Sequence, residues 1–94
     1  MITLKEIESI DTQYFNIIEV SAFFIVLQSR NTGHYWHLLR REPNNHISFF
    51  ISHKHHISDP YHPQACRGSI KACCVYIKEH DKYHISRKRG ICKG

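Results

Sequence analysis

Hydrophobic and polar positions alternate most regularly in HISFFISH, residues 46–53. In an extended chain Ile47, Phe49 and Ile51 point to one side, while Phe50 and the polar residues between them point to the other. Such alternation is typical of a strand that packs one side against a core and leaves the other side in solvent. The pattern therefore predicts a half-buried β-strand over these residues.

Two earlier segments have the composition of strands. The stretches YFNIIEV and SAFFIVLQS, residues 14–29, are rich in β-branched and aromatic side chains, as is HYWHLLRR, residues 34–41. The first segment predicts either two short strands or one long strand with an irregularity near Ser21. Together with residues 46–53, these strands predict an antiparallel meander.

Turn residues separate the predicted strands. Asn31 and Gly33 can adopt positive φ and favour a hairpin before residue 34. Pro43 stops ladder pairing, and the two asparagines that follow it suit a second turn. Residues 54–68 have no hydrophobic period and contain two prolines, so we expect a long loop there.

Helical spacing occurs near both ends of the chain. Thr3-Leu4-Lys5-Glu6 matches a capping box and predicts a helix of two to three turns. A second helix is expected from Ser69 to about Tyr83, with an apolar stripe of Ile70, Cys73, Cys74 and Ile77. The predicted fold is α+β: a three- to four-stranded antiparallel meander packed by a C-terminal helix, with a short N-terminal helix.

The predicted order of elements resembles that of double-stranded RNA-binding domains. Its βββα part is also similar to the arm-type DNA-binding domains of integrases. The lysine cluster that opens the second helix of the RNA-binding domains is missing, since GSIKACCVYIK offers only Lys71 and Lys78. The resemblance is one of layout, and we assign no family.

Length and charge define the domain boundaries. The 94 residues, 41% of them hydrophobic, suffice for one core, which we assign to residues 1–85. Residues 82–94 hold five basic and no acidic residues, whereas residues 1–81 hold eight of each, so the net charge of +5 comes from the C-terminus. We predict a basic tail over residues 86–94, either as a solvated, disordered end or as a contact for a polyanion.

The sequence indicates the cytoplasm. The longest apolar run, residues 22–27, is too short to cross a membrane, and the N-terminus lacks the features of a secretory signal. The spacing of the four cysteines does not form a disulfide framework, and Cys73 and Cys74 are adjacent, so we expect reduced thiols. We predict a cytoplasmic protein without a membrane partner, in which Cys73 and Cys74 act as small core residues.

The segment HKHHISDPYH, residues 53–62, concentrates metal-binding and catalytic residue types. A tetrahedral zinc site would use His53, His55, His62 and Cys66. The alternative is a solvated loop pinned by two prolines, and the absence of a Cys-x-x-Cys pair favours this loop. The expectation is therefore no cofactor and no native metal, with zinc in these four residues as the alternative.

A catalytic role for residues in and near this segment is not supported by other motifs in the sequence. Cys66 as nucleophile, His62 as base and Asp59 as orienting group have the required chemistry. The sequence adds no nucleophile elbow and no glycine-rich phosphate loop, and almost any pair of its nine histidines could be drawn as an acid–base pair. We predict a protein that is not an enzyme.

The strand at residues 34–41 predicts a binding surface. Trp36 and Arg40 share one face and Tyr35 and Arg41 the other, and helices can cover only one of them. Aromatic rings beside cations on an open sheet can stack bases and contact phosphates. The expected contact residues are Trp36, Arg40, Arg41, Phe50, Arg87, Lys88 and Arg89.

We therefore predict a nucleic-acid-binding module. The alternative is a protein-binding module or inhibitor, of the kind that phages and mobile elements encode, using the same surface. A third interpretation places the C-terminal helix over Trp36 and leaves ordinary surface elsewhere. Pairing of an exposed sheet edge would give a homodimer, and imidazole protonation between about pH 7.5 and 6 would strengthen polyanion binding.

Overall fold

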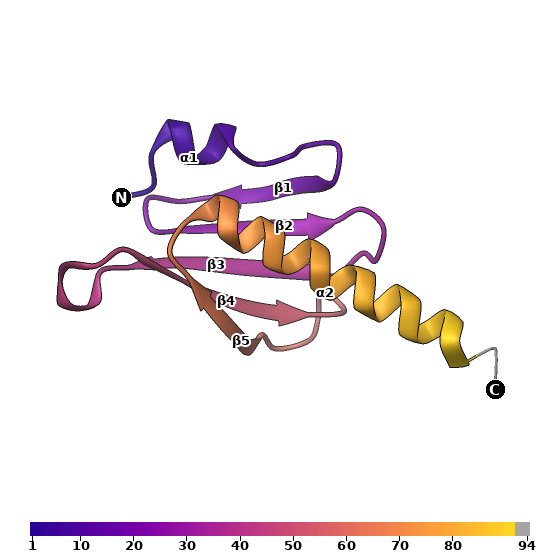
Figure 1. Ribbon diagram of the computed structural model, residues 1–94. Helices are drawn as coiled ribbons and strands as arrows, with labels where there is room; N and C mark the ends of the chain where they lie inside the picture. The colour runs from indigo at the N-terminus through magenta and orange to yellow at the C-terminus, as the bar shows by residue number, and fades with distance from the viewer. Residues whose placement is uncertain (92–94) are drawn as a thin grey trace.

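The computed structural model describes the backbone of residues 1–91 and the side chains of residues 1–85. One antiparallel sheet has its five strands in the order in which they follow along the chain, and a long helix crosses one of its faces (Figure 1). The fold is thus α+β, as predicted. The elements are α1 (Leu4–Glu8), β1 (Phe15–Val20), β2 (Phe24–Ser29), β3 (Tyr35–Arg41), the 3-10 turn η1 (Pro43–Asn45), β4 (Ser48–Lys54), β5 (His62–Arg67) and α2 (Ile70–Ile91).

The fifth strand corrects the predicted count of three to four. β5 lies within residues 54–68, which we expected to be a loop, and pairs antiparallel with β4. An irregular register between Ile51 and Ser52 accommodates Pro63, which lacks a backbone N–H and is tolerated at a sheet edge. Because β5 is an edge strand with most of its residues exposed, its sequence carries no alternation that would reveal it.

The predicted turns are confirmed. Gly33, between β2 and β3, has a φ of 75°, a conformation in which a side chain would be strained. Asn44 and Asn45, between β3 and β4, have φ values of 54° and 65°. Asparagine tolerates this left-handed region better than other non-glycine residues. These turns connect the three central strands as hairpins.

Both helices begin where the sequence indicates. Thr3 and Glu6 form a capping box, and the Ser69 hydroxyl accepts a hydrogen bond of 3.1 Å from the Ala72 N–H. However, α1 spans only five residues, and Leu4, expected on its apolar stripe, is 71% exposed. The helix α2 continues past the predicted end at Tyr83. None of the helices in the described part of the chain combines the length and apolar composition needed to cross a bilayer.

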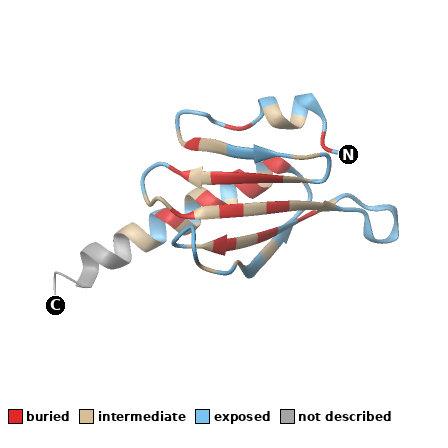
Figure 2. Cartoon of the chain, turned by 180° about the vertical axis from the view of Figure 1, so that it is seen from behind, coloured by how far each residue is buried: buried red, intermediate tan, exposed pale blue. Residues whose placement is uncertain are grey.

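The core lies between α2 and one face of the sheet. Trp36 of β3 is fully buried there, and its ring meets the rings of Tyr76 and His80 edge-on. The other main buried side chains of this layer are Phe15, Ile25, Leu27, Leu38, Phe49, Ile51, Ile70, Cys73, Cys74 and Ile77. Seen from behind, the opposite face of the sheet is not covered by α2 (Figure 2). The expectation of an exposed Trp36 is therefore wrong, because α2 covers the face that carries it.

The two adjacent cysteines are core residues, as predicted. Cys73 is fully buried and Cys74 is 6% exposed, and both are free thiols. Burial raises the pKa of Cys73 to about 12 and that of Cys74 to about 11, because a thiolate would lose its hydration there. These thiols act as small apolar groups at neutral pH.

A buried polar network joins α2 to the sheet. The carboxylate of Asp81, fully buried on α2, accepts hydrogen bonds of 2.6 Å from the Tyr14 hydroxyl and from the Ser29 hydroxyl. Ser29 Oγ in turn accepts a bond of 3.1 Å from the Trp36 indole N–H. Each polar group in this series of hydrogen bonds has a partner, which removes most of the cost of burying it. The network fixes the position of α2 across the sheet.

Replacement of Asp81 tests this network. Asp81→Ala leaves the hydroxyl donors of Tyr14, Ser29 and Thr32 without their acceptor, so we expect the free energy of unfolding to fall by about 3 kcal/mol. The matched control, Glu79→Ala, removes an exposed carboxylate from the same helix and should change it by less than about 0.5 kcal/mol. Urea unfolding followed by circular dichroism measures both. Equal effects of the two substitutions would contradict a role for Asp81 in holding the helix.

Candidate functional site

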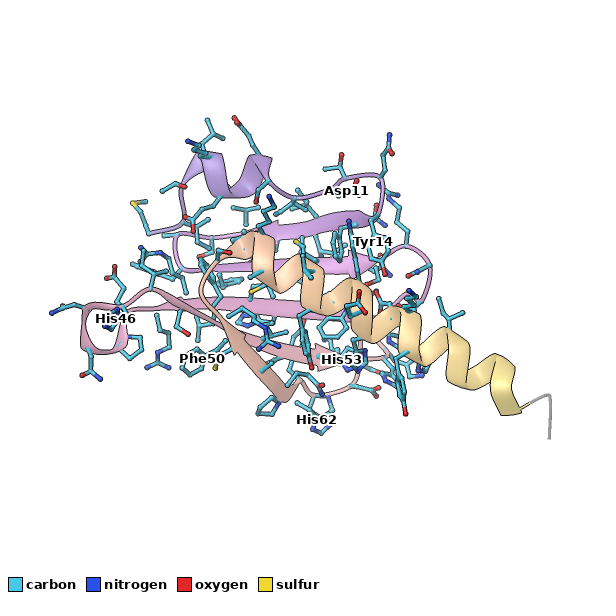
Figure 3. The ribbon with its side chains drawn as sticks, in the orientation of Figure 1. Asp11, Tyr14, His46, Phe50, His53 and His62 are labelled. Atoms are coloured by element: carbon cyan, nitrogen blue, oxygen red, sulfur yellow. The ribbon has the colours of Figure 1, made fainter. Side chains whose placement is uncertain are left out.

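Five histidines gather at the end of the sheet where β3 begins and β4 ends. They come from the β2–β3 hairpin, from β4 with the residue after it, and from α2. We call them the histidine cluster: His34, His53, His55, His80 and His84. Figure 3 shows His53 among the side chains packed around α2. Three separate segments thus bring their imidazoles to one place.

The sheet residues of the cluster are in direct contact. His53 Nε2 lies 3.1 Å from His34 Nδ1, a hydrogen-bond distance, and both residues are 6% exposed. The ring of His55 stacks on that of His34, with 4.0 Å between centroids and 6° between planes. The ring centroid of His53 lies 4.2 Å from that of Trp36, the neighbouring residue on β3. This packing holds the imidazoles of His34 and His53 in place.

The helix closes the cluster from the other side. His80 lies 5.0 Å from His53 and His84 lies 4.9 Å from His34, measured between ring centroids. The Nδ1 atom of His80 is buried and has no hydrogen-bond partner among the described residues. An unsatisfied buried nitrogen is costly and often marks a functional site. The cluster therefore contains more imidazole nitrogens than its own hydrogen bonds use.

Burial keeps the inner histidines neutral. It lowers the pKa of His34 to about 4 and that of His53 to about 3, and the neighbouring imidazoles add to the effect. The pKa of His80 is lowered for the same reason. The expected gain of charge between pH 7.5 and 6 is therefore wrong for His34 and His53. At neutral pH each neutral imidazole keeps one nitrogen lone pair, the form in which histidine binds metal ions rather than anions, and one of the two lone pairs accepts the hydrogen bond between the rings.

A pocket of about 440 Å³ opens beside the cluster. Its lining includes His53, His55, Asp59 and His62, so the histidine-rich segment does form one surface. Cys66 does not line this pocket. It lies on β5 opposite Phe50 of β4, and both face the other side of the sheet. The four residues considered for zinc, and the trio considered for catalysis, are thus only partly brought together.

Sequence reasoning missed His34, His80 and His84. A hairpin joining residues 34–41 to 46–53 brings their far ends, His34 and His53, side by side. The apolar stripe of α2 also continues at helical spacing from Ile77 to His80 and His84. Both signals were present in the sequence and predict the cluster once they are combined.

The face of the sheet away from α2 carries a row of rings, which we call the open face. Phe24 stacks on His37 with centroids 5.0 Å apart, and Tyr61 lies 5.5 Å from His37. The Lys54 ammonium lies 4.4 Å from the centre of the Tyr61 ring and 5.6 Å from that of Tyr35. Burial lowers the pKa of His37, so the row is aromatic and its charge comes from Lys54.

Two of the predicted contact residues meet on the open face. The Arg41 guanidinium lies 5.7 Å from the centre of the Phe50 ring, and both side chains are exposed. A groove of about 510 Å³ begins at Phe50 and is lined by His37, Leu39, Phe50, Ile51, Ser52, Pro63, Gln64, Ala65 and Cys66. Exposed aromatic rings beside a cation therefore lie on the face opposite Trp36.

The remaining predicted contact residues lie elsewhere. Arg40 is on the same side of β3 as Trp36, and its side chain is only 10% exposed. It pairs with Glu42 at 3.3 Å, so it is not part of the open face. The side chains of Arg87, Lys88 and Arg89 lie outside the residues that the structure describes.

Comparison of the sequence with protein-family models and with curated proteins, and of the fold with solved structures, finds no match. The functional conclusions below therefore depend on the side chains of this chain alone.

The lowered pKa values predict that acid destabilises the protein. Unfolded histidines protonate below about pH 6.5, whereas folded His34 and His53 stay neutral to about pH 4 and 3. The unfolded state thus binds more protons, and the stability present at pH 7 is lost progressively as pH falls below 6.5. Between pH 7 and 5 we expect a loss of about 2 kcal/mol or more, measured by urea unfolding in metal-free buffer.

The matched variant is His53→Gln, which removes one of the two titrating groups. Its loss of stability between pH 7 and 5 should be clearly smaller than that of the wild type. An unfolding free energy that stays level over this range in the wild type would contradict the burial of neutral imidazoles.

Proposed function

We propose that the protein is a non-enzymatic module that binds single-stranded nucleic acid on its open face. The observation that carries this proposal is the pairing of exposed or half-buried rings with cations: Arg41 with Phe50, and Lys54 with Tyr35 and Tyr61. Bases stack on aromatic rings whatever their sequence, while nearby cations contact the phosphates. The open face supplies both kinds of group next to each other.

The spacing of these pairs suits a short stretch of nucleic acid. Phe50 and Lys54 are four residues apart on β4, which corresponds to about 13 Å along a strand. The lining of the groove that begins at Phe50 includes apolar Leu39 and Pro63 and polar Ser52. A flat base can stack on the apolar residues while its edge meets a polar one. This arrangement supports binding of two or three nucleotides.

The charge distribution favours a polyanion over a polycation. Residues 28–81 hold seven basic and four acidic residues, and the C-terminal thirteen add five basic residues. On the open face itself, the cations beside the rings are Arg41 and Lys54. The carboxylate of Glu19 lies near the row of rings, and its charge partly opposes the lowering of the His37 pKa by burial. Long-range attraction would steer nucleic acid toward the protein, and short-range stacking would hold it.

A protein partner is the second candidate. The groove and its surroundings are largely apolar, and Phe50 together with the exposed Ile18, Val20 and Phe23 would suit a protein interface. Arginine and aromatic residues are also common at the centres of such interfaces. The two candidates differ in their response to salt, since phosphate contacts release counterions whereas apolar contacts do not.

Two substitutions on the open face test the proposal. Phe50→Ala removes one stacking platform and should weaken binding of a fluorescent single-stranded RNA or DNA by roughly 10-fold in anisotropy titrations. Arg41→Gln should weaken it less and reduce the slope of log affinity against log salt by about 0.7, as loss of one phosphate contact does. Binding of the wild type should fall steeply between about 50 and 200 mM salt.

The control is Lys71→Gln, which removes an exposed cation from α2 on the covered side of the sheet. The variant should bind with an affinity within about 2-fold of the wild type, because a cation on α2 does not reach nucleic acid bound on the open face. Joint replacement of Arg87, Lys88 and Arg89 by Gln measures the contribution of the tail separately. Affinity that does not respond to salt or to Arg41→Gln would reject the nucleic-acid proposal and favour a protein partner.

A further inference from the structure

Three imidazoles of the histidine cluster lie close enough together to bind one ion. Nitrogen atoms of His34, His53 and His55 all lie within 4.8 Å of one another. In a tetrahedral zinc site with Zn–N bonds of about 2.0–2.1 Å, ligand nitrogens are about 3.3 Å apart. The His53 Nε2 to His34 Nδ1 separation is 3.1 Å, and closing the widest separation needs a side-chain shift of about 1.5 Å or less. The nitrogen spacing thus fits a three-histidine metal site once the His55 ring, now stacked parallel to that of His34, turns toward the other two.

The fold positions two of these imidazoles before any ligand binds. His53 is held on β4 between β3 and β5 and packs on the Trp36 ring. His34 is fixed by its backbone, since its N–H donates to the Thr32 hydroxyl at 3.2 Å and its carbonyl accepts from the Ser29 N–H at 3.0 Å. Rigid, buried ligands lose little entropy on binding, so such a pair favours a metal ion.

The third imidazole is the adaptable one. His55 follows the end of β4 and is exposed, although its ring stacks on His34. It can rotate toward the point between the other two without disturbing the sheet. The adjacent pocket, lined by His53, His55 and His62 among others, gives an ion a route from solvent.

We infer that His34, His53 and His55 bind one late first-row divalent cation, Zn²⁺ or the chemically similar Co²⁺, with water in the fourth position. Imidazole-only ligation selects these ions over Mg²⁺ and Ca²⁺, which require oxygen ligands. The site differs from the zinc set considered from sequence, because His34 replaces His62 and Cys66. It lies on the α2 side of the sheet, so it does not depend on binding at the open face.

The experiment uses the untagged full-length protein, since a histidine tag would bind the same ions. Calorimetry with Zn²⁺ should give one site per chain, and Co²⁺ should produce the visible absorption of a tetrahedral complex. Binding should also change the emission of Trp36, the single tryptophan, because its ring centroid is 4.2 Å from that of His53. Mg²⁺ should produce none of these signals.

His55→Ala is the decisive variant, because His55 is exposed and its loss should not unfold the chain. Loss of a direct ligand should weaken Zn²⁺ binding by more than about 100-fold, beyond the 10- to 100-fold typical of outer-shell changes. The matched control is His56→Ala, an exposed histidine one residue further along that is absent from the cluster. It should bind Zn²⁺ as the wild type does.

The same titration separates this site from its alternatives. Near-ultraviolet circular dichroism of each metal-free variant confirms that its fold is intact. Equal weakening by His55→Ala and His56→Ala would mean adventitious binding by surface histidines, which overturns the inference. Loss of binding in Cys66→Ser, with a thiolate-to-Co²⁺ charge-transfer band in the wild type, would overturn it in favour of the set with Cys66. Absence of Zn²⁺ binding to the wild type would also reject it.

Discussion

The packing of α2 across one face of the sheet is the constraint on which the other features depend. Side chains on a strand alternate between two faces, so covering one face determines the surroundings of every residue on the central strands. Trp36 and His53 fall on the covered face and are buried, whereas Tyr35, Phe50 and Lys54 fall on the other. The Asp81 network fixes the helix in this position, because Ser29 and Tyr14 on the sheet side both donate to it.

The separation into a covered and an open face explains why the two proposed sites of one small chain differ in their chemistry. Under α2, exclusion of water keeps His34 and His53 neutral, and their packing brings two ring nitrogens within 3.1 Å, which suits a metal ion. On the open face, rings remain accessible and lie beside the cations Arg41 and Lys54, which suits a polyanion. The two sites use different residues and opposite sides of the sheet.

Much of the fold was predictable where local sequence determines local structure. The alternation of residues 46–53, the capping box at Thr3 and the paired asparagines of the second turn each act through neighbouring residues, and the structure has all three features. β5 could not be predicted in the same way. As an edge strand with exposed residues and Pro63 at an irregular position, it is defined by pairing with β4 rather than by its own pattern.

The location of the candidate sites depends on which face of the sheet α2 covers, and the sequence left this open. Alternation shows that Trp36 and Tyr35 lie on opposite faces, but not which face α2 covers. The polar continuation of the α2 stripe, with Asp81 and His84 after Ile77, disguised the part of the helix that packs against the sheet. A buried carboxylate with hydroxyl donors from distant strands is a tertiary feature, and only the assembled fold shows those partners.

Accessibility of Trp36 tests the central claim most directly, because it is the only tryptophan and lies at the centre of the covered face. In metal-free buffer at pH 7, we expect its emission maximum at a shorter wavelength than in urea, with acrylamide quenching several-fold weaker than for the unfolded chain. Emission and quenching equal to those of the unfolded chain, in a protein whose circular dichroism shows it to be folded, would contradict the position assigned to α2.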